Sequence, residues 1–182
     1  MSAGVLLTGG ASRRMGRDKA RLLVSGEPYA VHSARMLSAV CDPVVEVGDG
    51  ASGLPFVRED PPGAGPLAAV LAGVQALALP HPAPIVVLAC DLPFIDVAFL
   101  SLLADFDSEG SVLPVVEAEP QYACARWSPN ALATAQAAYE RGERAMRALL
   151  LAEDAVLLPA DSYADVLADV DTPDDLRRRG LS

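Results

Sequence analysis

The sequence predicts an α/β fold of the Rossmann-like kind, with a mostly parallel (mixed) sheet and helices on both faces. Apolar runs alternate with stretches of helical pattern along the chain, which is typical of a parallel sheet covered on both sides. The run from Ile85 to Cys90 is continuously apolar, as expected of a central strand. With 182 residues and 52% apolar content, the simplest expectation is one domain over residues 1–182.

The expected elements follow in chain order. We expect strands near residues 3–8, 43–47, 55–57, 84–90, 111–117, 121–127, 155–158 and 165–170. We expect helices near residues 28–40, 66–79, 97–105, 129–140, 143–152 and 173–179. The Pro- and Gly-rich stretches between them are too short to separate domains. Asp91 follows the central strand, and ligands of open α/β sheets bind at such strand ends where the strand order switches.

A cluster of basic residues follows the first apolar run and the glycine pair Gly9-Gly10. Five of the fourteen Lys and Arg residues lie within nine positions although the net charge is −10: they are Arg13, Arg14, Arg17, Lys19 and Arg21. Glycines let backbone N–H groups approach an anion, and cationic side chains neutralise it, so the segment is predicted to hold a polyphosphate. The spacing matches neither a P-loop nor G-x-G-x-x-G. The plainer alternative is a solvated basic loop before a helix.

Three aspartates are candidate metal ligands. Asp91 ends an apolar strand, where its carboxylate could hold Mg²⁺ against phosphate oxygens; alternatively it caps the next helix or turn. Asp169 and Asp171 are two positions apart in or just after an expected strand, which puts both on one face. Two facing carboxylates are costly unless a cation lies between them. Alternatively, Asp171 belongs to a turn, with Thr172 as N-cap of the next helix.

Four blocks in the chain resemble the MobA-type nucleotidyltransferases, the molybdenum cofactor guanylyltransferases. They are L-x-G-G-x-x-x-R-M-G-x-x-K from Leu7 to Lys19, G-P-L-A from Gly65, C-D-L-P from Cys90, and D-V-D-T-P-D-D-L from Asp169. The resemblance implies the fold of the nucleotide-diphospho-sugar transferases. It also implies transfer of GMP from GTP to the phosphate of molybdenum-molybdopterin, with Mg²⁺ as cofactor and pyrophosphate as the second product. Molybdoenzymes or cofactor-insertion chaperones would be further partners.

The same resemblance implies roles for single residues. The catalytic ones are Arg14, Lys19 and Asp91, and the metal ligands are Asp91, Asp169 and Asp171. The nucleotide-binding ones are Leu7, Thr8, Gly9, Gly10, Lys19, Asp60, Gly65, Pro66, Leu67 and Asp91. Alternatively, Asp60 is only a loop aspartate before proline. Pro120-Gln121 resembles an element near the acceptor site. Some members of the family carry an asparagine near the base at the position of Val47, so the backbone of Gly48-Asp49-Gly50 would substitute for that side chain.

Several rival functions stay open at this stage. Many MobA-type proteins carry Asn-x-Asn where this chain has Asp169-x-Asp171, and the Asp form resembles the cytidylyl branch. Gly9-Gly10 favours the guanylyl branch, because cytidylyl relatives tend to carry Ala-Ala-Gly there. The enzymatic alternatives are cytidylyl transfer to molybdopterin and nucleotidyl transfer to a sugar phosphate. The non-enzymatic alternative is a nucleotide-binding regulatory protein.

Composition argues against other classes of protein. A pI near 4.5 and 5% aromatic residues argue against a nucleic-acid surface, and no apolar stretch approaches the ~20 residues that cross a bilayer. Cys41, Cys90 and Cys124 are odd in number and widely spaced, which favours buried thiols in a reducing compartment. The first strand begins at Ala3 or Gly4 and leaves no room for a signal peptide. We therefore expect a cytoplasmic protein.

Overall fold

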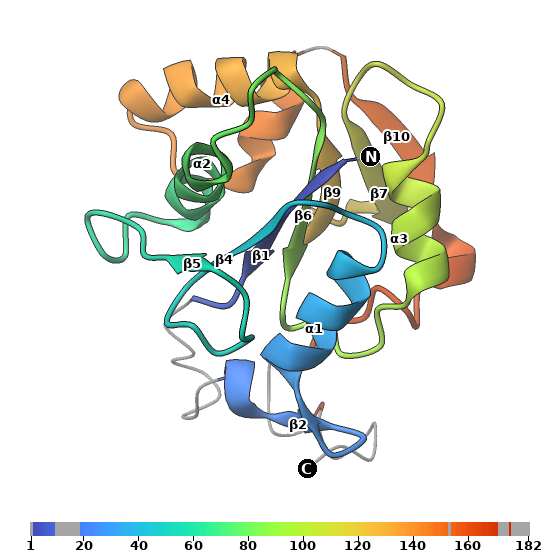
Figure 1. Cartoon of the computed structure of the whole chain (residues 1–182). Helices are drawn as coiled ribbons and strands as arrows, with labels where there is room; N and C mark the ends of the chain where they lie inside the picture. Colours follow the sequence, from blue (N-terminus) through green and yellow to red (C-terminus); the bar gives the residue numbers. More distant parts are fainter. Residues whose placement is uncertain (1, 10–18, 153, 171–174, 176–182) are drawn as a thin grey trace.

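The computed structural model of the chain describes residues 2–9, 19–152, 154–170 and 175, and Figure 1 shows a central sheet with helices on both faces. Within these residues the main sheet has eight strands in the order β10-β7-β9-β6-β1-β4-β5, with β8 paired to β7. Their bounds are β1 Ala3–Leu7, β4 Val44–Val47, β5 Phe56–Val57, β6 Ile85–Ala89, β7 Val112–Val116, β8 Glu119–Pro120, β9 Cys124–Trp127 and β10 Val156–Pro159.

The helical elements pack on two faces of this sheet. The α-helices are α1 Tyr29–Ser38, α2 Pro66–Leu77, α3 Val97–Ala104 and α4 Pro129–Glu140. The 3₁₀ turns are η1 Lys19–Arg21, η2 Met146–Ala152 and η3 Asp161–Tyr163. One core contains Leu6 of β1 and Phe99 of α3, and the other contains Val5 of β1 and Leu67 of α2. Because successive residues of β1 enter opposite cores, both faces of the sheet are covered.

The direction of the strands confirms a mostly parallel, mixed sheet. β5, β4, β1 and β6 run parallel to one another, and so do β7 and β10. β9 is antiparallel to both of its neighbours, β6 and β7. The parallel set places the carboxyl ends of β1, β4 and β6 at one edge, where Leu7 is level with both Ala89 and Val47.

Helix α2 carries a glycine, Gly73, on the side that packs against the sheet. A Cβ atom at Gly73 would lie 2.6 Å from Val5 Cγ1 and 2.9 Å from Val47 Cγ2, closer than real Cβ contacts. The bare backbone of the helix therefore rests on β1 and β4. This contact helps to set the position of the N-terminal turn of α2 at the carboxyl edge of the sheet.

The expected strand at 165–170 is wrong. Residues 161–163 form η3, residues 164–167 turn, and no strand follows within the described residues up to 170. Tyr163, Val166 and Leu167 are spaced like residues on one side of a helix and pack on the core that contains Phe99. The Tyr163 ring lies 4.9 Å from that of Phe99, and Leu167 N–H donates to the carbonyl of Tyr163 at 2.9 Å. The side chain of Tyr163 therefore holds this segment in a turn.

Other expectations differ in detail. The expected α-helix at 143–152 is the 3₁₀ turn η2 over a shorter range, and β9 begins at Cys124 because Cys124 N–H closes a turn onto the carbonyl of Gln121. A small hairpin that the sequence analysis missed joins β2 (Leu23–Val24) and β3 (Glu27–Pro28). The expected helix at 173–179 lies outside the described residues apart from position 175. Among the helices that the structure does describe, none combines the length and the apolar character needed to cross a membrane.

Candidate active site

The candidate site lies at the carboxyl edge of the sheet, where the strand order switches on either side of β1. The chain leaves β1 for β4 on one side through α1, and it returns through α2 to β6 on the other side. Thr8 and Gly9 follow β1, and Asp91 follows β6 by two residues. Cys90 N–H donates to the carbonyl of Leu7 at 3.0 Å, which brings these two ends together. Such a switch point is where open α/β sheets bind ligands.

A cavity of about 460 Å³ opens beside β1 and β4 at this edge. We call it the glycine-lined cavity; its walls are Gly9, Val47, Gly48, Asp49, Arg58, Glu59, Pro62, Gly63, Gly65, Pro66 and Ala69. Its volume falls in the range of small-molecule sites. Three residues predicted to bind a nucleotide, Gly9, Gly65 and Pro66, therefore come together from distant parts of the chain.

Charged side chains lie on the outer wall of the cavity. Arg58 Nε donates to Asp49 Oδ1 at 2.9 Å, and both side chains are largely exposed. Glu59 Oε1 accepts a hydrogen bond from Gly63 N–H at 2.7 Å, which closes the loop that leads to α2. The ion pair is a solvent-screened surface contact, so it contributes little to stability.

The N-terminus of α2 forms another wall. Gly65 precedes the helix with φ of 104°, a conformation that favours glycine, and a Cβ there would lie 3.2 Å from the carbonyl oxygen of Arg144. Pro66 occupies the first turn, where a missing N–H has no cost. Leu67 N–H donates to the carbonyl of Arg144 at 3.1 Å, and its side chain is buried in the core. Leu67 thus fixes the helix start but does not line the cavity.

The end of β1 is tied to the end of β4. The N–H groups of Thr8 and Gly9 both donate to the carbonyl of Val47, at 3.0 and 3.2 Å. Thr8 Oγ1 donates to Glu46 Oε1 at 2.5 Å. A Cβ at position 48 would overlap Thr8 Oγ1, so only glycine fits there. Thr8 therefore supports the cavity wall from behind, and Leu7 is buried within the sheet.

Glu46 is the residue of this site that the sequence analysis missed. Its side chain is fully buried. The carboxylate oxygens accept hydrogen bonds from the N–H groups of Gly50, Ala51 and Ser52, each at 2.9 Å. They also accept hydrogen bonds from the hydroxyls of Thr8 and Ser52. Burial opposes ionisation, but the hydrogen bonds from Ser52 and Thr8 outweigh it and lower the pKa of the carboxyl. The available signal was a charged residue in the otherwise apolar strand Val44–Val47.

The predicted metal ligands are only partly described. Asp91 is half-buried, and its carbonyl accepts Val170 N–H at 3.1 Å, so the segment that contains the exposed Asp169 meets the end of β6. Within the described residues no three His, Cys, Asp or Glu side chains gather as a metal-binding group. Asp171 lies outside these residues, as do Gly10 and Arg14. Lys19 begins η1, and its side chain is not described.

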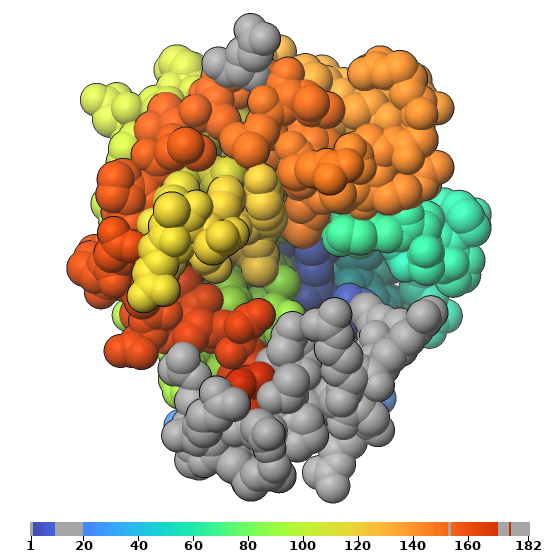
Figure 2. Space-filling view, turned by 180° about the vertical axis from the view of Figure 1, so that it is seen from behind, coloured from blue at the N-terminus to red at the C-terminus, as the bar shows by residue number. Residues whose placement is uncertain are grey.

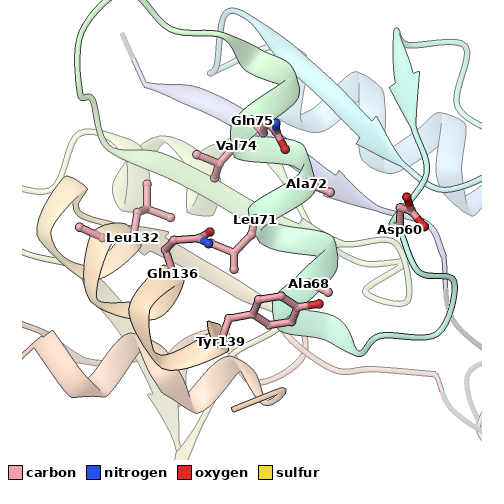
Figure 3. Close-up of a pocket in the computed structure, with 10 residues that line it drawn as sticks. Asp60, Ala68, Leu71, Ala72, Val74, Gln75, Leu132, Gln136 and Tyr139 are labelled. Carbon is pink, nitrogen blue, oxygen red and sulfur yellow. The ribbon is translucent and has the colours of Figure 1, made fainter. Parts of the chain in front are cut away.

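Asp60 is exposed and borders a second hollow rather than the glycine-lined cavity. This groove, about 550 Å³, runs between α2 and α4, and Figure 3 shows Leu71 and Val74 of α2 facing Leu132 and Tyr139 of α4 across it. Asp60 lies on the side of α2 that is opposite to α4 (Figure 3).

Comparisons with known proteins agree with this fold. The model of the MobA-like NTP transferase domain matches residues 4–156. A protein of Opitutus terrae named probable molybdenum cofactor guanylyltransferase is 40% identical over 157 residues, which cover 82% of this chain and 78% of that protein.

Two solved structures have the same fold. Molybdopterin-guanine dinucleotide biosynthesis protein A of Archaeoglobus fulgidus matches with a TM-score of 0.75 and 20% identity, over 97% of this chain and 95% of that one. The 2-C-methyl-D-erythritol 4-phosphate cytidylyltransferase of Thermus thermophilus matches with a TM-score of 0.71 and 18% identity, over 98% and 97% of the two chains. Because one fold carries both names, it does not by itself select the nucleotide.

Proposed function

The chain belongs to the MobA-like NTP transferase family, and we propose that it is a molybdenum cofactor guanylyltransferase formed as one domain over residues 1–182. It would transfer GMP from GTP to the terminal phosphate of molybdenum-molybdopterin. The products are the molybdopterin guanine dinucleotide cofactor and pyrophosphate. The name of the 40% identical relative supports the choice of substrates.

The observation that carries the proposal is the glycine-lined cavity at the switch point of the sheet. Gly9, Gly48 and Gly65 line it and have no side chains, so a bound nucleoside can come close to the backbone at three places in the wall. The basic segment that follows Gly9 would then bind the triphosphate, with Lys19 as a point charge and Arg14 through forked contacts. Base, ribose and phosphates would thus extend from the cavity toward Asp91.

The donors at the end of β6 fit Mg²⁺ in their chemistry. Mg²⁺ prefers one or two carboxylates together with phosphates and water, and Asp91 offers a half-buried carboxylate beside the segment of Asp169. We propose that Asp91, with Asp169 or Asp171, holds the ion. When bound, Mg²⁺ would neutralise charge on the phosphates during transfer.

The chain itself contributes position and charge. An oxygen of the acceptor phosphate forms a bond to the α-phosphorus of GTP, and the bond from that phosphorus to the bridging oxygen of pyrophosphate breaks. The acceptor phosphate is already ionised, so no strong general base is required. Lys19 and Arg14 would stabilise the added charge, while the cavity would fix the nucleoside so that the acceptor oxygen attacks the α-phosphorus in line with the leaving pyrophosphate.

Pyrophosphate release in the presence of molybdopterin tests the proposal. We expect release with GTP and Mg²⁺, much less with CTP, and none when EDTA removes the metal. Lys19→Ala should weaken triphosphate binding, since a hydrogen bond to a charged group contributes about 1.5–3 kcal/mol. Faster release with CTP would reassign the chain to cytidylyl transfer, and tight GTP binding without any release would favour a regulatory protein.

A further inference from the structure

The buried carboxylate of Glu46 lies directly behind the glycine-lined cavity. Its strand, β4, ends one residue later, at Val47, and the next two residues, Gly48 and Asp49, are part of the cavity wall. Glu46 is fully buried, which is unusual for a glutamate, and an ionised carboxylate in such a place requires several hydrogen-bond donors.

The donors come from the two segments that flank the cavity wall. Gly50, Ala51 and Ser52 direct their N–H groups at the carboxylate, each at 2.9 Å, and the Ser52 hydroxyl adds another bond. Thr8, at the end of β1, donates its hydroxyl at 2.5 Å. One side chain thus fastens the β4–β5 loop and the end of β1 to each other.

These bonds determine which backbone faces the cavity. The N–H groups of residues 50–52 point to Glu46, and Gly48 N–H donates to the carbonyl of Val57 at 2.9 Å. Gly50 has a φ of 78°, and its backbone packs under the ring of Phe56. The loop is therefore held from behind, and Gly48 and Asp49 are its residues that line the cavity.

We propose that Glu46 is a positioning residue for nucleotide selection, which holds the Gly48–Asp49 backbone where it contacts the base. The inference rests on the proposed function, because it takes the glycine-lined cavity as the nucleoside site. On the Watson–Crick edge guanine presents N1–H and N2–H donors, whereas cytosine presents the acceptors N3 and O2. A fixed backbone can therefore discriminate between the two bases through its carbonyl groups. Val47 provides no polar side chain for this purpose. The Asp49 carboxylate pairs with Arg58 and that of Glu59 accepts Gly63 N–H, so we take the Gly48–Asp49 backbone as the part that contacts the base.

The test compares Glu46→Gln with the wild-type protein in calorimetric titrations of GTP, CTP and inorganic tripolyphosphate, each with Mg²⁺. The amide keeps the size of the side chain but turns two N–H donors toward the donors of the loop. We expect the Kd of GTP to rise about tenfold or more, as for loss of charge-assisted hydrogen bonds. The preference for GTP over CTP should shrink, while tripolyphosphate binding stays within about twofold of wild type.

Two further variants separate positioning from general stability. Ser52→Ala keeps the carboxylate but removes one donor, and it should move GTP affinity in the same direction by a smaller factor. Asp154→Asn is the matched control: this half-buried carboxylate accepts the Ser128 hydroxyl at 2.6 Å beside the start of α4 and lines neither described cavity. We expect Asp154→Asn to lower Tm without changing the ratio of GTP to CTP affinity.

Each outcome has a clear reading. A lower Tm for Glu46→Gln with an unchanged ratio of GTP to CTP affinity would overturn the inference, and so would an equal loss for tripolyphosphate and GTP. If Glu46→Gln does not fold, an unchanged ratio in Ser52→Ala would overturn it. A wild-type protein that binds no GTP would refute the proposed function together with the inference, which distinguishes the two failures.

Discussion

Replacement of Gly73 by alanine measures how closely α2 packs on the sheet. In a helix interior this change gains about 1 kcal/mol from backbone propensity. The new methyl group would lie 2.6 Å from Val5 Cγ1 and 2.9 Å from Val47 Cγ2, both in the buried core. Overpacking of this kind costs about 1–3 kcal/mol, so we expect a net loss of up to about 2 kcal/mol. For a protein of this size that corresponds to a Tm lower by about 2–4 °C per kcal/mol.

Chemical unfolding of four proteins checks this reasoning. Wild type, Gly73→Ala, Val5→Ala and the double variant form a cycle, and removal of the Val5 methyls should make Gly73→Ala less destabilising by about 1 kcal/mol or more. Ala76→Gly, at an exposed position of the same helix, reports the propensity effect alone. A higher free energy of unfolding for Gly73→Ala than for wild type would contradict this packing, because the space above β1 would then be larger than described.

Three other changes have defined outcomes. Asp91→Asn should nearly abolish pyrophosphate release while GTP still binds in titration, because the amide loses the charge that attracts Mg²⁺. The pKa of Glu46 lies below its ordinary value of 4.5, so its contribution to stability is complete above about pH 4.5 and is lost as pH falls through the lowered pKa. Acid titration followed by circular dichroism should therefore show a steeper loss in wild type than in Glu46→Gln. Arg126→Met should cost about 3 kcal/mol or more in urea unfolding but leave GTP affinity unchanged, because this buried guanidinium donates to four carbonyls, that of Ala104 at the end of α3 and those of Phe106, Ser108 and Gly110 in the loop that follows.

The sequence was most informative where one periodicity dominated. The apolar run at Ile85 and the helix that begins at Pro66 were predicted nearly at their observed bounds, because burial on both faces and a proline at the first turn are local signals. The prediction of a strand at 165–170 was wrong because no single periodicity dominates near Leu167. Its few apolar residues fit a strand or a turn, and only the contact of Tyr163 with Phe99 decides between them.

The candidate site was predictable in outline from its glycines. Gly9 stood out because it follows a predicted strand, and Gly65 because its G-P-L-A block resembles that of the MobA-type family; both line the cavity. Glu46 could not be assigned in the same way. Its partners lie up to 38 residues away, and a single charge in a short strand is equally consistent with an edge that faces water.

The reversed direction of β9 has an evolutionary consequence. Because β9 runs against β6, the segment before Cys124 arrives at the same edge as the end of β6, and Ala89 N–H donates to the carbonyl of Ala123 at 2.7 Å. In Figure 2 the yellow β7–β9 region and the teal β4–α2 region flank the dark blue segment at the end of β1 from opposite sides. Insertions at the Glu117–Ala118 turn, between β7 and β8, can therefore lengthen one side of this edge without shifting the register of the sheet or the other side. Related proteins can therefore change the ligand that binds beside β7 and β9 while they retain the ligand that binds beside β4 and α2.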